Sequence, residues 1–308
     1  MEKAVSVHNI HKHYGNAKAL QGISFEVERS EIFGIIGPDG AGKTSLFRIM
    51  TTLIFTDEGT CTIDGLDVAK DYKEIRKRVG YMPGRFSLYQ DLTVEENLTF
   101  FSAVFGTSIQ ENYYLIEDIY KQLEPFKTRR AGNLSGGMKQ KLALCCALIH
   151  KPSVLFLDEP TTGVDPVSRK EFWEMLKRLQ KQGISIVVST PYMDEANLCD
   201  RIALIKSGQF MKIDTPDNII NGFDVLLWSV KSHQMFRLLN DLRAVEYIDN
   251  CYVSGEFHHF TTHFDYFDVK ELKQQLIEKG HNNIVIETIK PTIEDCYMRL
   301  TPKSEKKN

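Results

Sequence analysis

The hydrophobic residues of this chain predict buried strands that alternate with amphipathic helices. Three short runs are mainly apolar without alternation, as expected of strands covered on both faces, and they lie at 32–36, 154–157 and 184–189. Helical patterns follow the first two runs, beginning near residues 45 and 169. Because strands and helices alternate in this way, the sequence predicts a doubly wound α/β core with a parallel sheet.

The rest of the first 220 residues differs from this core in pattern. Alternating or short apolar segments predict further strands at 4–7, 20–27, 60–63 and 78–82. Residues 11–15, which lie between the first two of these strands, are expected to form a loop. From 84 to about 150 the pattern is helical, with the clearest runs at 94–105 and 114–123.

Beyond about residue 220 the pattern changes again, which predicts two domains, 1–220 and 221–308. Strands and helices are expected in the order β–α–β–β–α–β, followed by a last helix at 291–300. This order predicts a small ferredoxin-like α+β module for dimerisation or regulation, with 301–308 as a disordered tail. His258, His259 and His263 suggest a metal site only weakly, since neighbouring strand residues point to opposite faces.

Composition and charge narrow the possible functions. Of the 308 residues, 42% are hydrophobic and 26% are charged, which is the balance of an ordinary globular protein. The formal net charge of -3 argues against a general nucleic-acid binder. No apolar run approaches the roughly 18 residues of a membrane span, and the first residues lack the layout of a signal peptide. A membrane role is therefore expected to come through a partner, and the six cysteines, without metal-site spacing, fit a reducing cytoplasm.

A glycine-rich segment after the first buried run matches the phosphate-binding loop pattern. Its residues are Gly37, Pro38, Asp39, Gly40, Ala41, Gly42, Lys43, Thr44 and Ser45. Glycines let successive backbone N–H groups converge on phosphate oxygens, and the following helix N-terminus and the Lys43 ammonium add positive charge. Thr44 places a hydroxyl where a phosphate-bound Mg²⁺ would lie. The alternative is a tight turn without a ligand, but the expected strand before it and helix after it favour phosphate binding.

Further candidate residues lie elsewhere in the chain. Tyr14 could stack on an adenine ring, although taken alone it is better explained as a half-buried loop tyrosine. Asp158 and Glu159 end a buried strand, where one carboxylate can hold Mg²⁺ and the other can orient an attacking water. Their alternative role is to cap the next helix. Another helix is expected to begin with a serine cap and two glycines that leave its backbone uncovered. Its N-terminus either receives an anion or is only a capped helix end. The residues are Leu134, Ser135, Gly136 and Gly137.

Taken together, these motifs resemble the ATP-binding subunit of an ABC transporter over roughly residues 4–218. The resemblance implies a P-loop NTPase fold with a RecA-like core, an antiparallel β subdomain and a helical subdomain at about 85–150. It also implies that ATP and Mg²⁺ are bound between two such domains. Tyr14 would then stack on adenine, Glu159 would be the catalytic carboxylate, and Thr44 with Asp158 would serve Mg²⁺. The Leu134–Gly137 signature would contact the partner's ATP, and Asp165 would couple the two domains.

Three segments that are less specific than the signature resemble the multidrug or polysaccharide exporter branch (ABC-2 type), whose membrane subunits are separate chains. These features lie at 91–98, 192–196 and 291–295. The resemblance implies a peripheral location on the inner face of the membrane, with residues 84–105 docking a membrane subunit. Two other functions remain open at this point. One is a soluble ABC ATPase that acts on ribosomes or DNA, and the other is an ATP-sensing regulatory subunit without hydrolysis.

At two positions the sequence departs from the family pattern. Gly84 stands where the family usually has a glutamine, and Pro191 stands where it usually has a histidine that contacts the γ-phosphate. Neither residue can replace the missing donor. Because one lost transition-state donor costs roughly 10²- to 10³-fold in rate, ATP binding is expected to persist while hydrolysis slows. Arg85, Gln90 or Tyr192 would have to compensate; otherwise this chain forms the slow site of a heterodimer, or one of two slow sites in a homodimer.

Overall fold

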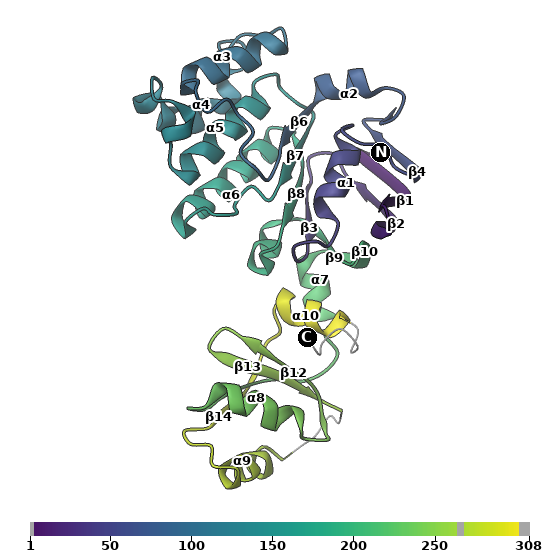
Figure 1. Ribbon diagram of the computed structural model, residues 1–308, viewed down its shortest axis with the longest axis vertical. Helices are drawn as coiled ribbons and strands as arrows, with labels where there is room; N and C mark the ends of the chain where they lie inside the picture. Colours follow the sequence, from purple (N-terminus) through teal and green to yellow (C-terminus); the bar gives the residue numbers. More distant parts are fainter. Residues whose placement is uncertain (1–2, 264–267, 302–308) are drawn as a thin grey trace. The chain divides into compact units, whose positions relative to one another are not determined.

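A computed structural model describes residues 3–263 and 268–301, and the chain divides into two units, Met1–Pro216 and Asp217–Asn308. Figure 1 shows the strands and helices of each unit. Among the described residues, no helix combines the length and the apolar character that a bilayer span requires. Each unit has its own hydrophobic core.

The first unit is built on a six-stranded sheet with the order β10-β9-β3-β8-β7-β6. Five of these strands run parallel, and β10 pairs antiparallel to β9 at one edge. The bounds of the sheet strands are β3 Ile32–Ile36, β6 Val79–Met82, β7 Val154–Asp158, β8 Ser185–Thr190, β9 Arg201–Lys206 and β10 Gln209–Asp214. Since β3, β7 and β8 are fully buried, their apolar runs reflect cover on both faces. The pair β9 and β10 was not predicted from the sequence.

A second, antiparallel sheet of the first unit has the order β2-β1-β4-β5. Its strands are β1 Val5–Tyr14, β2 Ala17–Val27, β4 Glu58–Ile63 and β5 Leu66–Asp67. Phe25 of β2 stacks on Phe33 of β3 with ring centroids 5.2 Å apart, so the main core lies between the two sheets. The expected loop at 11–15 is wrong, because β1 continues to Tyr14. Register shifts along β1, with Asn9 at φ 48, break the alternation that would have revealed the longer strand.

Helices flank the parallel sheet, and α3, α4 and α5 form a separate layer at its β6 edge (Figure 1). The α-helices of this unit are α1 Lys43–Met50, α2 Tyr72–Arg78, α3 Val94–Val104, α4 Tyr113–Leu123, α5 Gly136–Leu148 and α6 Pro166–Lys181. Short 3-10 helices follow as η1 Glu124–Phe126, η2 Ala131–Asn133 and η3 Met193–Leu198. Buried Asn97 of α3 bonds backbone groups of Tyr89, Leu92 and Thr93, which anchors the segment that enters this layer.

The second unit contains a four-stranded antiparallel sheet with the order β12-β13-β11-β14. Its elements are α7 Pro216–Asn221, β11 Leu227–Lys231, α8 Met235–Arg243, β12 Ile248–Ser254, β13 Phe257–Thr262, α9 Val269–Glu278, β14 Val285–Ile289 and α10 Ile293–Leu300. From β11 to β14 the order of elements is β–α–β–β–α–β, as the sequence suggests. Phe260 and residues of α8 and α9 form the core on one face. The predicted disordered tail lies, from residue 302 onward, outside the described residues.

A buried carboxylate fastens α10 to the opposite face of this sheet. Asp295 is fully buried and accepts hydrogen bonds of 2.7 Å from the Tyr252 hydroxyl and from both the N–H and the hydroxyl of Thr292; His259 Nδ1 lies 2.7 Å away as well. Burial alone would raise the pKa of Asp295, but the hydrogen bonds from His259, Thr292 and Tyr252 outweigh it and lower the pKa to about 2. The ionised carboxylate is therefore part of the folded structure.

We predict that Asp295→Asn destabilises the second unit by about 2–4 kcal/mol, because the new amide N–H₂ faces hydrogen-bond donors. The pKa of Asp295 is lower in the folded state than in the unfolded state. The contribution of Asp295 to the free energy of unfolding is therefore complete above about pH 4 and falls as the pH approaches 2. Hydrogen exchange of peptides from 217–301 between pH 2 and 7 would show this loss in the wild type and its absence in the variant. Glu294→Gln, on an exposed neighbour, is the control; equal acid sensitivity of Asp295→Asn and wild type would contradict the prediction.

Candidate functional site

The loop between β3 and α1 adopts a shape that only glycine allows at two positions. Gly42, the N-cap of α1, has φ 105, and a Cβ there would lie 2.4 Å from the carbonyl oxygen of Ala19. A Cβ on Gly37 would lie 2.2 Å from the carbonyl oxygen of Ile205. The loop can therefore pack against β2 and β9 while the N-terminus of α1 stays uncapped by any side chain. A free helix N-terminus within a glycine loop suits a phosphate group.

Lys43 connects this loop to the acidic pair at the end of β7. Its ammonium donates to the carbonyl oxygens of Gly37 and Pro38 at 2.7 and 2.9 Å, and it lies 3.1 Å from Glu159 Oε1. The Lys43 side chain is only 3% exposed, so its charge is directed inward rather than into solvent. The structure thus brings together two residues that the sequence suggested separately.

The two acidic residues differ in environment. Asp158 is buried and its Oδ1 accepts a 2.6 Å hydrogen bond from the Ser189 hydroxyl on the neighbouring strand β8. Glu159 has φ 53, in the left-handed region that costs a non-glycine residue roughly 1 kcal/mol. Its N–H donates to both the carbonyl and the hydroxyl oxygen of Ser189 at 3.0 Å, which stabilises this turn. The turn aims the Glu159 side chain toward the loop while Asp158 stays in the sheet.

A cavity of about 360 Å³ lies over the loop and collects most of the predicted nucleotide-binding residues. Its walls are Tyr14, Ala19, Asp39, Gly40, Gly42, Lys43, Thr44, Ser45 and Glu159. Tyr14 is 47% exposed, and Lys12 Nζ lies 5.8 Å from its ring centroid. An aromatic ring at one part of the wall and a phosphate-type loop at another match the two ends of a nucleotide. Thr44 and Glu159 of this wall carry oxygen donors of the kind that Mg²⁺ takes, and so does Asp158, which is not itself among the wall residues.

The signature segment lies apart from this cavity. Ser135 caps α5 by accepting a hydrogen bond from the Met138 N–H at 3.3 Å, and both Ser135 and Gly136 are exposed. A Cβ on Gly137 would lie 3.0 Å from the Ser168 hydroxyl, so the signature packs against the start of α6. Asp165 caps α6, and the hydrogen bond from the Ser168 N–H lowers the pKa of Asp165. The signature and the Asp165 turn therefore form one surface of the chain.

The two departures from the family pattern lie near the acidic pair. A Cβ on Gly84 would lie 3.0 Å from the carbonyl oxygen of Asp158, so this position faces the end of β7. Pro191 directly follows β8. The cavity walls named above include none of the three residues considered as replacements, Arg85, Gln90 and Tyr192. Close by, burial and then the charge of Asp158 raise the pKa of Tyr81 to about 12, so this phenol stays protonated.

Three residues that shape the site were not predicted from the sequence. Ala19 forms part of the cavity wall, and its carbonyl oxygen is what excludes a side chain at position 42. Ser189 positions both acidic residues, and the Thr190 carbonyl oxygen accepts a 3.2 Å hydrogen bond from the Gly37 N–H. A polar end to the buried run at 184–189 was the available signal, but the strand order was needed to interpret it.

Comparison with known proteins agrees with this site. The ABC transporter family matches residues 20–162. The probable multidrug ABC transporter ATP-binding protein YbhF of Escherichia coli (strain K12) is 39% identical over 220 residues, which is 71% of this chain and 38% of YbhF. The Nod factor export ATP-binding protein I of Burkholderia lata is 35% identical over 304 residues, 96% of each chain.

Solved structures give the same result. A structure of cbiO1 from Clostridium perfringens, described as part of the ABC transporter complex cbiONQ, has a TM-score of 0.64 at 25% identity and covers 72% of this chain and 92% of cbiO1. A dimeric ATP-binding cassette bound to ADP and Pi in a post-hydrolysis state has a TM-score of 0.62 at 26% identity, covering 68% and 98%. The phosphate loop, the acidic pair and these likenesses lead to one conclusion: the chain belongs to the ABC transporter family and is one of its ATP-binding, ATP-hydrolysing subunits.

Proposed function

We propose that this chain is the ATP-binding subunit of an exporter and powers separate membrane subunits. The observation that carries the proposal is the pairing of a cavity lined by the phosphate loop, Tyr14 and Glu159 with a signature surface that lies outside it. One chain thus offers a binding site for its own ATP and a second, exposed element that fits the ATP of another domain. The names of the relatives, multidrug and Nod factor export proteins, support export as the direction of transport.

In this proposal the first unit binds and orients Mg·ATP with side chains and backbone of the cavity wall. Tyr14 stacks on the adenine, and the backbone N–H groups of the phosphate loop with Lys43 bind the phosphates. Thr44 and Asp158 would hold Mg²⁺, which neutralises phosphate charge when bound. Glu159 lies at the wall of the cavity, where its carboxylate orients the water that attacks the γ-phosphate.

The signature surface is proposed to act on a second ATP-binding domain. Ser135 and Gly136 are exposed at the N-terminus of α5, where an anion is favoured by the helix dipole. Asp165, on the same surface, would transmit the closure of the dimer. The dimeric cassette among the similar structures supports such an assembly. The second domain is either another copy or a different ATPase chain.

Hydrolysis at the chain's own site is proposed to be slow. Gly84 and Pro191 supply no side-chain donor near the acidic pair, whereas the elements that bind nucleotide are complete. We therefore propose a heterodimer in which this chain clamps one ATP and its signature completes a faster site on the partner. A homodimer with two slow sites is the alternative assembly.

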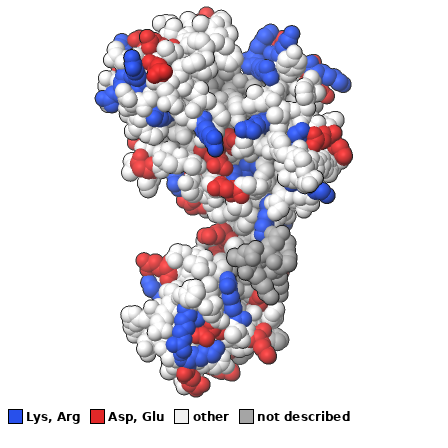
Figure 2. All heavy atoms as spheres, viewed as in Figure 1, with Lys and Arg blue, Asp and Glu red and all other residues white. Residues whose placement is uncertain are grey.

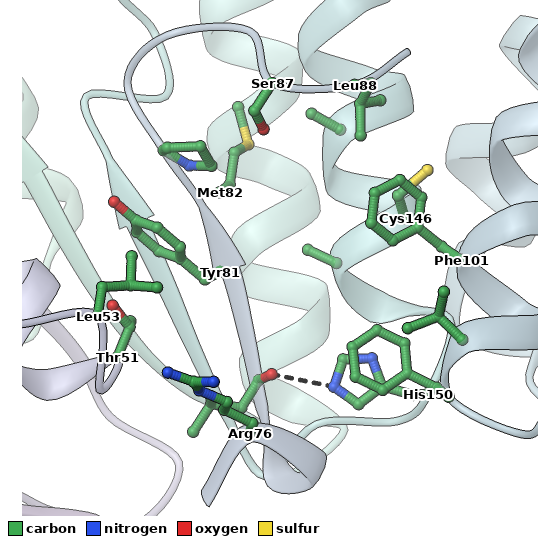
Figure 3. A pocket seen from close by; sticks show the side chains of 16 residues that line it. Thr51, Leu53, Arg76, Tyr81, Met82, Ser87, Leu88, Phe101, Cys146 and His150 are labelled. Atoms are coloured by element: carbon green, nitrogen blue, oxygen red, sulfur yellow. Dashed lines mark hydrogen bonds between the residues drawn. The ribbon is translucent and has the colours of Figure 1, made fainter. Parts of the chain in front are cut away.

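A second cavity, of about 420 Å³, is proposed to dock a membrane subunit (Figure 3). Its walls come from β6, the segment after Gly84, α3 and the end of α5, and they are mainly apolar. At one end the His150 ring stacks on Phe105 with centroids 3.8 Å apart, and its Nε2 lies 3.0 Å from the Val79 carbonyl oxygen. Burial lowers the pKa of His150 against the opposing effect of that hydrogen bond, so this ring stays neutral, whereas Arg76 brings a positive charge to another part of the wall.

The charge distribution favours a membrane partner over the rival function on ribosomes or DNA. On the face shown in Figure 2, basic and acidic side chains are interspersed, whereas a nucleic-acid binder needs a basic stripe. We propose a peripheral location on the inner membrane face. Residues 1–220 would be the nucleotide-binding domain and 221–308 an accessory domain for dimerisation or regulation. Cargo would be selected by the membrane subunits.

Removing the proposed adenine platform should weaken nucleotide binding. We expect Tyr14→Ala to reduce the affinity for Mg·ATP about tenfold, and Tyr14→Phe to change it less than about twofold, because stacking needs the ring and not the hydroxyl. Titration calorimetry of the purified chain measures both. Tyr114→Ala, which removes a tyrosine that is 52% exposed on α4, is the control. Unchanged affinity in Tyr14→Ala would show that adenine binds elsewhere.

Supplying the missing donor should accelerate hydrolysis. We expect Pro191→His to raise the ATP turnover of the chain alone by roughly 10- to 100-fold, because it restores one contact to the developing γ-phosphate charge. Glu159→Gln in the same background should remove the gain. Phosphate release at saturating Mg·ATP measures the rates. The slow-site proposal fails if the wild-type chain alone turns over at the rate of a fully equipped transporter site and Glu159→Gln abolishes that rate.

A charge in the docking cavity should uncouple transport from nucleotide binding. Val104 lines the cavity and is 61% exposed, so Val104→Asp places a carboxylate where an apolar partner surface would cover it. We expect at least about a tenfold loss of transport by the reconstituted complex, with unchanged ATP affinity. Val253→Asp, on a valine that is 56% exposed in the second unit, is the matched control. Equal transport by the two variants would exclude this docking site.

A further inference from the structure

A cluster around Arg169 connects two loops that the proposed function treats separately. Arg169 lies in the first turn of α6, just after the Asp165 cap. Its guanidinium carbon is 4.2 Å from the ring centroid of Tyr192, its Nε is 3.6 Å from Glu195 Oε1, and its Nη1 is 3.7 Å from Asp194 Oδ2. A single side chain thus makes three contacts to the segment that follows β8 and ties it to α6.

The burial of Glu195 makes this link more than a surface ion pair. The Glu195 side chain is 1% exposed, and among the described residues neither of its carboxylate oxygens has a hydrogen-bond partner. A buried carboxylate is costly unless a nearby cation compensates its charge, and Arg169 is placed to do so. A planar guanidinium can face a carboxylate and stack on an aromatic ring at once, which a lysine ammonium cannot do.

The segment held by Arg169 begins at the nucleotide-facing end of β8. The Tyr192 N–H donates to the Thr190 hydroxyl at 3.1 Å, and the Thr190 carbonyl oxygen accepts from the Gly37 N–H in the phosphate loop. One residue earlier, Ser189 bonds both acidic residues of the site. The loop and the acidic pair are therefore connected to Arg169 through a few residues of continuous, hydrogen-bonded chain.

The other end of the link is the surface proposed to meet the second domain. Asp165 caps the helix turn that carries Arg169, and the signature glycine Gly137 packs on Ser168 in that same turn. A displacement of the Asp165 turn would move Arg169 with it, because both belong to the first turn of one rigid helix.

We infer that Arg169 is a positioning residue that couples the partner-facing Asp165 turn to the nucleotide-facing end of β8. The inference rests on the proposed function, because it requires a second domain to contact the Asp165 turn. Arg169 is not part of the nucleotide cavity wall, so it acts through Tyr192 and Glu195. Because Pro191 offers no side-chain contact to phosphate, the geometry of the site near the phosphates depends more on the backbone position of this segment.

The test uses variants that separate coupling from stability. Arg169→Gln combined with Glu195→Gln removes both charges together, so no uncompensated buried carboxylate remains. Tyr192→Leu removes the stacked ring, whereas Tyr192→Phe keeps it and removes only the hydroxyl. The matched control is Arg178→Gln with Asp118→Asn, which breaks an ion pair of 3.4 Å farther along α6. Each variant is measured as the isolated chain and in the complex with its co-purifying subunits.

We expect the double Arg169/Glu195 variant and Tyr192→Leu to lower kcat for ATP in the complex about tenfold, the size of a typical coupling between sites. The affinity of the isolated chain for Mg·ATP should change less than about twofold, and the unfolding midpoint should match the control. Tyr192→Phe should keep wild-type kcat. Asp165→Ala added to the double variant should lower kcat no further, because both changes break the same link.

Three results would overturn the inference. They are a kcat of the double variant equal to that of the control, an equal loss in Tyr192→Phe and Tyr192→Leu, and a loss of kcat accompanied by an equal loss of ATP affinity or stability. Failure of the proposed function has a different signature. In that case the wild-type chain forms no ATP-hydrolysing complex, and no variant is needed to see it.

Discussion

The site depends on the backbone at the end of β8, because that strand end fixes both of its neighbours. The Thr190 carbonyl oxygen accepts from the Gly37 N–H on one side, and Ser189 accepts from the Glu159 N–H on the other. Parallel pairing places all three strand ends at one edge of the sheet. Lys43 and Glu159, distant in sequence, are brought within 3.1 Å as a result. The strained turn at Glu159 persists because two hydrogen bonds offset its cost.

This arrangement separates the requirements for nucleotide binding from those for hydrolysis. Under the proposed function, binding depends on glycine conformations, a helix N-terminus and Lys43, all of which follow from the loop itself. Hydrolysis would additionally depend on side chains just beyond the ends of β6 and β8, where this chain carries Gly84 and Pro191. We therefore expect substitutions at the two positions to change the rate of the reaction while the loop that binds the phosphates stays intact.

Local patterns were predictable from the sequence, whereas contacts between distant segments were not. The phosphate loop, the Ser135 cap and the buried strands are each encoded within a short window, and the structure has them where expected. The end of β1 at Tyr14 was missed because bulges break the alternation that marks a strand. The Ser189–Asp158 hydrogen bond depends on the register between two strands, and the Asp295 network joins three elements of the second unit. The spacing of hydrophobic residues along the chain does not indicate which residues of distant segments contact each other.

The geometry of α5 also bears on how a membrane subunit could drive this chain. Its N-terminus carries the signature, and its C-terminal residues Cys146 and Ala147 line the proposed docking cavity. Gly84 lies in the chain between the cavity residues Pro83 and Ser87 and faces the carbonyl oxygen of Asp158, but it has no side chain to transmit a displacement toward the acidic pair. The route along α5 is a rigid helix whose N-terminus, under the proposed function, meets the partner's ATP. Under the proposed function, a docked membrane subunit would therefore act more strongly on the partner's site than on the site in this chain.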